Sequence, residues 1–341
     1  MANPAIDDAL AEYGALTRAS MVDYLPKGAP SKHLSEPAAD YPSRGGKMMR
    51  PSICIAAARA YGASVDEAVR LAVSIELLHN ALLIHDDIED ESETRRGEPT
   101  LHIKYGLPVA LNAGDALALA SLRPIADTLP NLGPWLGVSL ITELDRMARE
   151  TAEGQAIELG WRADNTIELA PEDYLVMVLK KTCWFSTIYP LRVGAMLALR
   201  SDLPADAFVR LGFFIGAAFQ IQDDILNIEA DDRYGKEICG DLLEGKRTLM
   251  LIDLLHRLKG AERTRLIDTL ETPRAAQKDE DVVWIRRRMI EEGSLDRAKA
   301  TARGLVGAAA HEFELIFRDL PETKDKAFLR ALAPWALSRA A

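Results

Sequence analysis

The stretch that decides the fold reads Leu77-Leu78-His79-Asn80-Ala81-Leu82-Leu83-Ile84 and continues as His85-Asp86-Asp87-Ile88-Glu89-Asp90-Glu91-Ser92-Glu93. Its first half is apolar almost all round, which indicates a helix in the middle of a helical bundle rather than on its surface. Its second half is a run of carboxylates that follows without a break. We expect a helix so deep in a core to deliver its acidic end to a cavity or cleft.

The spacing inside this first acidic cluster predicts a metal site. Asp86 and Asp90 are four residues apart and share one helix face, with Asp87 beside them. Like charges at this spacing repel each other, so the cluster favours a bound cation. Oxygen ligands that leave room for water and phosphate suit Mg²⁺. The alternative is an acidic helix end that lies in water, because charge runs are usually solvated.

A second cluster, Gln220-Ile221-Gln222-Asp223-Asp224-Ile225-Leu226-Asn227, repeats this arrangement at the end of another apolar helix. Asp223 and Asn227 have the same four-residue spacing, and Asp224 follows Asp223 directly. If the two clusters face each other across one cavity, they can hold several Mg²⁺ ions and a diphosphate between them. The pair is therefore a much stronger signal than either cluster alone.

Basic residues are distributed around both acidic clusters: Lys47, Arg50, Arg95, Arg96, Lys181, Lys236 and Lys246. Lys47 and Arg50 follow Gly45-Gly46 and precede a predicted helix, which is a usual place for binding anions. Any one of these cations alone is more often a surface residue. Their mixture with the acids suits one diphosphate held by metal and a second diphosphate held by arginine.

Helix-forming residues dominate the rest of the chain, and strand-like alternation is scarce. A Pro-, Gly- and Ser-rich loop is expected over 26–46. Prolines are expected at helix starts and glycines at helix ends: Pro51, Pro108, Pro134, Pro171, Gly62, Gly260 and Gly293. Helices are predicted over 5–24, 51–61, 65–90, 108–128, 134–153, 172–199, 205–228, 247–259, 280–292, 295–319 and 323–338. The chain is therefore expected to be all-α, with one domain over 1–341.

Composition excludes several other classes of protein. The chain has 341 residues, of which 48% are hydrophobic and 27% charged, so it can bury a core without disulfides. A net charge of −11 disfavours nucleic-acid binding, which needs a basic face. The three cysteines are far apart and form no CxxC pair, which favours a reducing compartment. No uninterrupted apolar run of about 18 residues predicts a membrane span, so the expected location is the cytoplasm.

With these motifs the sequence resembles the trans-prenyl diphosphate synthase (polyprenyl synthetase) family, and within it the geranylgeranyl diphosphate synthases. The resemblance extends from about Gly45 to about Leu251. It rests on GGKMMRP (45–51), ELLHNALLIHDDIEDESETRRG (76–97), KKT (180–182), FQIQDDILN (219–227) and GKEICGDLLEGKRT (235–248). Met48-Met49 replaces a more usual basic–apolar pair. Asn227 replaces a carboxylate, and we do not expect it to bind metal.

The resemblance implies an antiparallel helix bundle around a deep central cavity, dimeric in most relatives. It implies Mg²⁺ ions, about three for each site, on Asp86, Asp87 and Asp90 from one wall and on Asp223 and Asp224 from the other. The residues implied around the allylic diphosphate are Arg95, Lys181, Thr182, Gln220, Lys236 and Lys246. The residues implied around isopentenyl diphosphate are Lys47, Arg50, His79 and Arg96. The residues expected to act in catalysis are Asp86, Asp90, Arg95, Lys181, Thr182, Gln220, Asp223 and Lys236.

Product length is expected to depend on the helix before the first cluster. Leu82 and Leu78 lie one and two helical turns before Asp86, and one turn rises about 5.4 Å, near the length of an isoprene unit. In the family an aromatic residue at position 81 stops growth early. Ala81 leaves space, which favours geranylgeranyl diphosphate as the product.

Other interpretations remain open from the sequence. The alternative products are farnesyl diphosphate and a longer polyprenyl diphosphate. A terpene cyclase of the same fold would need no second diphosphate site, so Lys47, Arg50 and Arg96 argue against it. A regulatory subunit commonly lacks one acidic cluster, whereas both are largely intact here. A purely structural helical bundle leaves the paired clusters unexplained.

Overall fold

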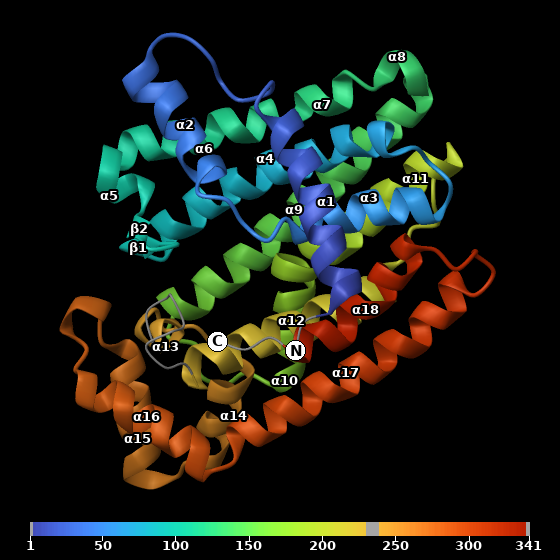
Figure 1. Ribbon diagram of the computed structural model, residues 1–341. Helices are drawn as coiled ribbons and strands as arrows, with labels where there is room; N and C mark the ends of the chain where they lie inside the picture. The colour runs from blue at the N-terminus through green and yellow to red at the C-terminus, as the bar shows by residue number, and fades with distance from the viewer. Residues whose placement is uncertain (1–2, 230–238, 339–341) are drawn as a thin grey trace. The chain divides into compact units, whose positions relative to one another are not determined.

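The computed structural model describes residues 3–229 and 239–338 (Figure 1). It is 78% helical, and over the described residues the strands are limited to a short antiparallel hairpin of β1 (Thr94–Arg95) and β2 (Glu98–Pro99). The all-α class expected from the sequence is therefore confirmed.

The helices follow one another with short connections. In chain order they are α1 (Pro4–Met21), the π-helical turn η1 (Ser31–Ser35), α2 (Glu36–Ser43), α3 (Met49–Ala60), α4 (Val65–Glu89), α5 (Leu101–Tyr105), α6 (Leu107–Ala120), α7 (Leu122–Ala126), α8 (Leu129–Leu132), α9 (Pro134–Ala163), α10 (Pro171–Val178), the π-helical segment η2 (Leu179–Ile188), α11 (Tyr189–Leu199), α12 (Val209–Glu229), α13 (Gly240–Leu243), α14 (Leu249–Arg257), α15 (Gly260–Glu271), the 3₁₀ turn η3 (Arg274–Ala276), α16 (Asp279–Glu291), α17 (Ser294–Phe317) and α18 (Lys324–Ser338).

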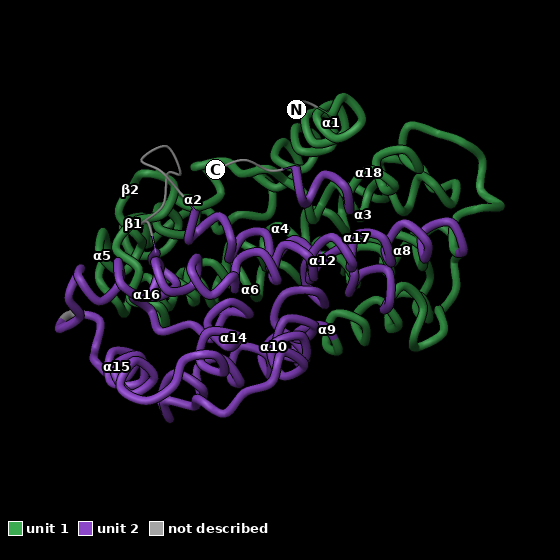
Figure 2. Tube along the Cα trace, turned by 90° about the horizontal axis from the view of Figure 1, so that it is seen from below, with its two compact units in different colours: residues 1–146, 187–208, 316–332 green, residues 147–186, 209–315, 333–341 purple. Residues whose placement is uncertain are grey.

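The chain divides into two compact units that interleave along the sequence (Figure 2). Unit 1 comprises Met1–Arg146, Thr187–Phe208 and Ile316–Leu332. Unit 2 comprises Met147–Ser186, Val209–Leu315 and Ala333–Ala341. The first acidic cluster lies in unit 1 and the second in unit 2. A single domain over 1–341, with both clusters at one cavity, stays a prediction.

Helix α4 organises unit 1 and packs against α1, α3, α6 and α7. It begins at a Ser64 N-cap that accepts a hydrogen bond from the backbone N–H of Glu67, and acidic residues in its first turn suit the helix dipole. Its apolar residues join a buried core with α1, α2 and α6: Met21, Tyr41, Val73, Leu77, Ala81, Ile84, Ala113 and Leu117. Helix α4 also has the length and composition of a membrane span, but 72% of its most apolar window is buried in the protein. A core helix explains this property.

In unit 2, the second acidic cluster lies on helix α12. This helix packs against α10 and the short α13, while α14 packs against α10 and α16. Ile221 and Ile225 are almost completely buried, and the ring of Phe219 lies 5.4 Å from that of Trp335, measured between centroids. This packing fixes the helix whose C-terminal half carries the second acidic cluster.

The expected loop over 26–46 is wrong in part, because η1 and α2 occupy residues 31–43. Pro37 stands in the first turn of α2, where a proline costs no hydrogen bond. Tyr41 is buried in the core of unit 1, and Arg44 Nε donates to Asp40 Oδ1 over 2.6 Å. Tertiary packing thus stabilises a short helix whose composition is typical of a loop.

Some predicted boundaries were also wrong. Gly260 does not end a helix but begins α15, which was not predicted, and α9 continues to Ala163 instead of ending near 153. Gly62 and Gly293 do follow helix ends, with φ of 98° and 69°. The predicted helix over 172–199 is helical throughout, but its central part, η2, is π-helical.

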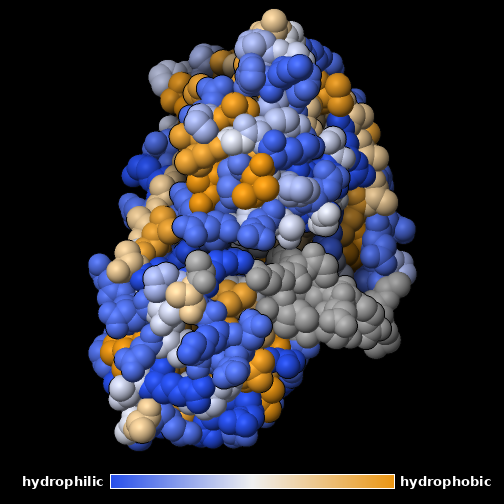
Figure 3. All heavy atoms as spheres, turned by 90° about the vertical axis from the view of Figure 1, so that its left-hand side faces the viewer, coloured by the Kyte–Doolittle hydropathy of each residue, from blue (hydrophilic) through white to orange (hydrophobic). Residues whose placement is uncertain are grey.

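The surface is polar with scattered apolar side chains. The face in Figure 3 is mostly hydrophilic, with small groups of apolar residues between. Helix α6 and the start of α9 expose several large apolar residues: Leu107, Leu111, Leu119, Trp135, Val138 and Ile141.

Candidate active site

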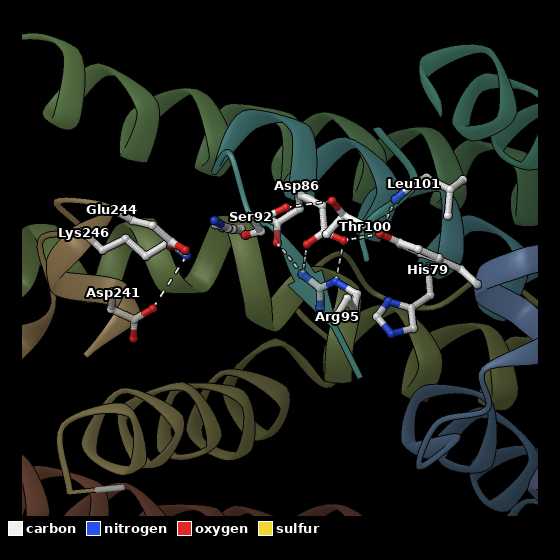
Figure 4. Close-up of polar contacts among 12 residues, drawn as sticks. His79, Asp86, Ser92, Arg95, Thr100, Leu101, Asp241, Glu244 and Lys246 are labelled. Atoms are coloured by element: carbon white, nitrogen blue, oxygen red, sulfur yellow. Dashed lines mark hydrogen bonds and ion pairs between the residues drawn. The ribbon is translucent and has the colours of Figure 1, made fainter. Parts of the chain in front are cut away.

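In the first acidic cluster, neighbouring aspartates have different environments. Asp87 is fully buried and accepts hydrogen bonds from the Tyr41 hydroxyl of α2 and from Arg95, whose Nε lies 2.7 Å from Asp87 Oδ2. Asp86 is more exposed, and its Oδ2 lies 3.7 Å from Arg95 Nη2 (Figure 4). Asp90 is buried at the C-cap of α4. Asp87 therefore fixes the position of Arg95, and Asp86 is the carboxylate that remains accessible.

Arg95 is held firmly in its charged form. Burial alone would lower the pKa of its guanidinium, but the hydrogen bonds to Asp87 and the charges of Asp87 and Asp86 raise it above its usual value. The hairpin that carries Arg95 is tied to α2, since Arg44 donates to the backbone carbonyls of Arg95 (3.1 Å) and Pro99 (2.8 Å). Arg95 is thus a permanent cation beside the first acidic cluster.

A basic cluster in unit 1 is formed by Lys47, Arg50, His79 and Arg96. Arg50 Nη1 lies 3.3 Å from His79 Nε2, and burial with the nearby arginine charges lowers the pKa of His79 well below its usual value. His79 is therefore neutral. Because arginine can only donate, His79 Nε2 accepts and its Nδ1 carries the proton. The ring of His79 is shown in Figure 4.

The backbone around the basic cluster is unusual. Met48, the N-cap of α3, and Arg96, in the hairpin turn, both have left-handed conformations with φ of 54° and 56°. Non-glycine residues rarely adopt such conformations, and they persist where surrounding structure enforces them. A Cβ built on Gly46 would lie 2.9 Å from Arg96 Nη2, so the missing side chain lets the guanidinium rest on the loop. These features bring Arg96 against the loop that carries Lys47.

In the second acidic cluster, Asp224 is buried and Asp223 is half-buried. Asp224 Oδ2 accepts from the Tyr174 hydroxyl of α10 over 2.7 Å, and its Oδ1 accepts from Gln220 Nε2 over 2.8 Å. Thr182 Oγ1 in turn donates to Gln220 Oε1 over 3.0 Å. Burial and the charge of nearby Asp241 raise the pKa of Asp224 to about 8, although its hydrogen bonds partly oppose this.

Lys181 and Thr182 lie in η2, the π-helical segment. Helix α9 touches η2 at Gly154, where any side chain would collide with the backbone of Lys181. One turn later, buried Glu158 forms an ion pair with Lys181 Nζ. π-Helical turns occur frequently at functional sites. Here the turn presents Lys181 and Thr182 on the side of α9 and α12.

Lys246 belongs to a separate acidic group in unit 2. Its Nζ lies 2.6 Å from Glu244 Oε2 and 3.7 Å from Asp241 Oδ1 (Figure 4). The Asn227 side-chain oxygen accepts from the backbone N–H of Asp241 over 3.2 Å, so this amide has a local structural partner. Lys236, predicted to bind the allylic diphosphate, lies outside the described residues.

The residues fit Mg²⁺ as an open metal site. Over residues 3–229 and 239–338, no three His, Cys, Asp or Glu side chains converge into a complete ligand cluster. Three acids, Asp223, Asp224 and Asp241, nevertheless lie near one another in unit 2. Burial raises the pKa of Asp224, and the charges of Asp241 and Asp223 raise it further. Mg²⁺ usually takes one or two protein carboxylates and completes its shell with water and phosphate oxygens. In unit 1 the predicted ligands are Asp86 and Asp90, with Asp87 as a supporting residue. In unit 2 the predicted ligand is Asp223, supported by Asp224.

The residues predicted to set product length differ in exposure. Ala81 is 1% exposed and belongs to the core shared with α6. Leu78 and Leu82 are half-buried, and with Asp86 they follow the four-residue spacing of one face of α4.

The sequence did not reveal several supporting residues: Tyr41, Arg44, Glu76, Glu158, Tyr174 and Asp241. Tyr41 and Arg44 fell in the expected loop. Tyr174 contacts Asp224 of the second acidic cluster only through tertiary packing. Asp241 stands inside the quoted 235–248 motif, and that position was a signal that could have found it.

Comparisons with known proteins identify the family of the chain. The polyprenyl synthetase family model matches residues 31–289. The chain is 30% identical over 328 residues to the geranylgeranyl pyrophosphate synthase of Geoglobus acetivorans, covering 93% of this chain and 94% of the relative. It is 35% identical over 269 residues to the geranylfarnesyl diphosphate synthase of Aeropyrum pernix, covering 78% and 82%.

A solved structure is also similar: geranylgeranyl pyrophosphate synthase from Corynebacterium glutamicum, complexed with isoprenyl diphosphate and magnesium. The TM-score is 0.79 at 25% identity, covering 98% of this chain and 97% of the other. Fold and motifs together define an all-α prenyltransferase. The chain belongs to the polyprenyl synthetase family. The resemblance and the prenyltransferase function expected from the sequence are confirmed, and the roles of individual residues stay predictions.

Proposed function

We propose that the chain is a Mg²⁺-dependent enzyme that joins an allylic diphosphate to isopentenyl diphosphate, with geranylgeranyl diphosphate as its product. The observation that supports this proposal is the second acidic cluster, in which buried Asp224 accepts hydrogen bonds from the neutral groups of Tyr174 and Gln220. Burial and the charges of Asp241 and Asp223 raise the pKa of Asp224, and a divalent ion would relieve this repulsion. Basic residues in both units offer the charge that two diphosphates need.

In the proposed reaction the allylic C–O bond breaks, and its electron pair leaves with the diphosphate. Bound Mg²⁺ would stabilise the negative charge of that leaving group. Arg95 and Lys181 add fixed positive charge, and each is pre-positioned by an acid, Asp87 and Glu158.

The remaining steps need a dry, non-nucleophilic pocket, because water would capture the allylic cation. The hydrogen-bonded pair Thr182–Gln220 offers neutral dipoles near that cation without a strong nucleophile. The double bond of isopentenyl diphosphate attacks the cation, and the departing diphosphate accepts the proton that is then lost. No Ser–His or Cys–His nucleophile is required.

The purified chain tests this proposal directly. Incubation with farnesyl diphosphate, isopentenyl diphosphate and Mg²⁺ is expected to release diphosphate and an elongated product, and a chelator is expected to stop it. A terpene cyclase would instead consume geranylgeranyl diphosphate alone. A regulatory subunit would be inactive without a partner. Either of these outcomes would overturn the proposal.

Product length is the part of this proposal that depends on α4. Leu82 and Leu78 lie on the face of α4 that carries Asp86, and Ala81 lies beside them toward α6. Ala81→Phe is expected to shorten the main product by one isoprene unit, measured by mass spectrometry, and Leu82→Ala to lengthen it. Because position 81 is buried, folding of the variant must be checked, since overpacking costs about 1–3 kcal/mol. An unchanged product distribution in folded Ala81→Phe removes Ala81 from the account.

We also propose a homodimer and a cytoplasmic location. The exposed apolar side chains of α6 and the start of α9, including Trp135 at 85% exposure, support a second copy of the chain as the partner. Light scattering of wild type and Trp135→Glu tests this, and a monomeric wild type would contradict it. The three cysteines are buried and form no disulfide, which supports a reducing compartment.

A further inference from the structure

One cation near the basic cluster belongs to none of the motifs that predicted the site. Arg18 lies in α1, which packs against both α3 and α4 in unit 1. Gly14 stands one turn before it on the same helix face. A Cβ built on Gly14 would lie 3.1 Å from Met48 Cβ and 3.4 Å from Arg18 Nη1. The missing side chain therefore lets α1 approach the loop before α3 and brings the Arg18 guanidinium beside Met48.

Arg18 shares this position with the other cations of the cluster. Lys47 precedes Met48, Arg50 lies in the first turn of α3, and Arg96 rests on Gly46. The segment 46–50 thus carries Lys47 and Arg50 itself and has Arg18 of α1 and Arg96 of the hairpin next to it. The left-handed backbone at Met48, which is buried, fixes the loop between them.

A single buried acid, Glu76 of α4, lies under these cations. It is 3% exposed, and Asn80 Nδ2 lies 3.4 Å from its Oε1. The charges of Arg50, Arg96 and Arg18 all act on it. His79, the remaining member of the cluster, is neutral. Three arginines therefore act on this carboxyl group, and guanidinium groups gathered in one place favour an anion that they bind together.

We propose that Arg18 is an additional residue that binds the diphosphate of isopentenyl diphosphate, together with Lys47, Arg50, His79 and Arg96, next to the buried acid Glu76. The inference rests on the proposed function, because it assigns a residue to the isopentenyl diphosphate site. It adds the N-terminal helix to the substrate-binding elements of unit 1.

Steady-state kinetics of Arg18→Gln tests the inference. Loss of one charge-assisted hydrogen bond is expected to raise the KM for isopentenyl diphosphate by about 10- to 100-fold. The KM for the allylic diphosphate is expected to change less than about twofold, because that substrate is held elsewhere. Arg18→Lys keeps the charge and is expected to recover part of the loss. The control Arg123→Gln removes a charge from an exposed position of unit 1 and is expected to leave both KM values unchanged.

A double variant separates binding from a merely structural ion pair. If Arg18 only neutralises Glu76, then Arg18→Gln/Glu76→Gln restores the KM for isopentenyl diphosphate, and the inference is overturned. If Arg18 binds the diphosphate, the KM stays high in the double variant. Calorimetric binding of isopentenyl diphosphate in the presence of a chelator, compared among folded variants, checks the same point without turnover.

Arg50→Gln distinguishes failure of this inference from failure of the proposed site. If Arg50→Gln raises the KM for isopentenyl diphosphate and Arg18→Gln does not, Arg18 is excluded and the site stands. If neither variant changes it, the site assignment itself is wrong.

Discussion

The two acidic clusters both bury their second aspartate, but they differ in one of the hydrogen-bond donors to it. In each, the second aspartate is buried and accepts a hydrogen bond from a tyrosine of a neighbouring helix: Tyr41 for Asp87 and Tyr174 for Asp224. The other donor differs. Asp87 receives the guanidinium of Arg95, whereas Asp224 receives the neutral amide of Gln220.

This difference shows where the protein supplies a cation and where it needs one. In unit 1, Arg95 compensates the buried charge within the fold. In unit 2, burial and Asp241 raise the pKa of Asp224 to about 8, so ionisation is unfavourable until a cation arrives. A bound Mg²⁺ would lower that pKa, so we predict that the cluster around Asp224 depends more strongly on metal than the cluster around Asp87. The first aspartates, Asp86 and Asp223, are the more exposed members of their pairs and are the predicted ligands.

The largest expected effect comes from removing these first aspartates. Asp86→Asn and Asp223→Asn keep the shape of the side chain but remove a metal ligand, and kcat/KM is expected to fall by about 10³-fold or more. Steady-state assays over a range of Mg²⁺ concentrations measure this. If either variant kept near wild-type activity at limiting Mg²⁺, that aspartate would not be a metal ligand.

Arg95→Gln tests the built-in cation of unit 1. It leaves the buried Asp87 carboxylate without its counter-charge, so the free energy of unfolding is expected to fall by about 3–5 kcal/mol. Chemical denaturation measures this, with Arg123→Gln as an exposed control expected to stay within about 0.5 kcal/mol. A loss in Arg95→Gln no larger than in the control would show that Arg95 does not compensate Asp87.

Glu76 is a third buried acid, and like Asp87 it lies near arginines. Burial raises its pKa from 4.5 to about 7 against the opposing charges of Arg50 and Arg96. Between these values the folded state holds a proton that the unfolded state has released. The contribution of Glu76 to stability is therefore most favourable at low pH and falls as pH rises through this window, by up to about 3 kcal/mol.

Glu76→Gln has no such proton. From pH 5 to pH 8 the wild type is thus expected to lose more unfolding free energy than Glu76→Gln does. Denaturation at both pH values measures this difference. Parallel pH profiles for the two proteins would show that Glu76 is not perturbed.

The smallest expected effect separates the two tyrosines. Tyr174→Phe removes a hydrogen bond that favours ionised Asp224, so the Mg²⁺ concentration for half-maximal activity is expected to rise several-fold, for a loss of about 1 kcal/mol. Tyr41→Phe leaves Arg95 on Asp87 and is expected to change this concentration little. Equal shifts in the two variants would remove the distinction between the clusters.

The sequence predicted the helices that carry the acids well, because apolar runs and four-residue spacings are local signals. The bounds of α4 differ from the prediction by one residue. Helix α2 was missed, because its prolines suggest a loop while buried Tyr41 and the Asp40–Arg44 pair stabilise a helix only in the folded protein.

The sequence also did not predict which residues contact the acidic and basic clusters. Tyr174 is 50 residues from Asp224, and Arg18 is far from every motif, so neither spacing points to a shared site. The backbone of η2 lies against Gly154 of α9, where a Cβ would be 2.2 Å from Lys181 N. These features arise from tertiary packing, which residue spacing in one chain does not encode.

The most direct test of the account is a crystal structure with Mg²⁺ and an unreactive thiolo analogue of farnesyl diphosphate. The account predicts metal ions that Asp86 and Asp223 both ligate and that bridge to one and the same diphosphate group. An analogue bound with metal on Asp86 while Asp223 binds no ion of that diphosphate would contradict it.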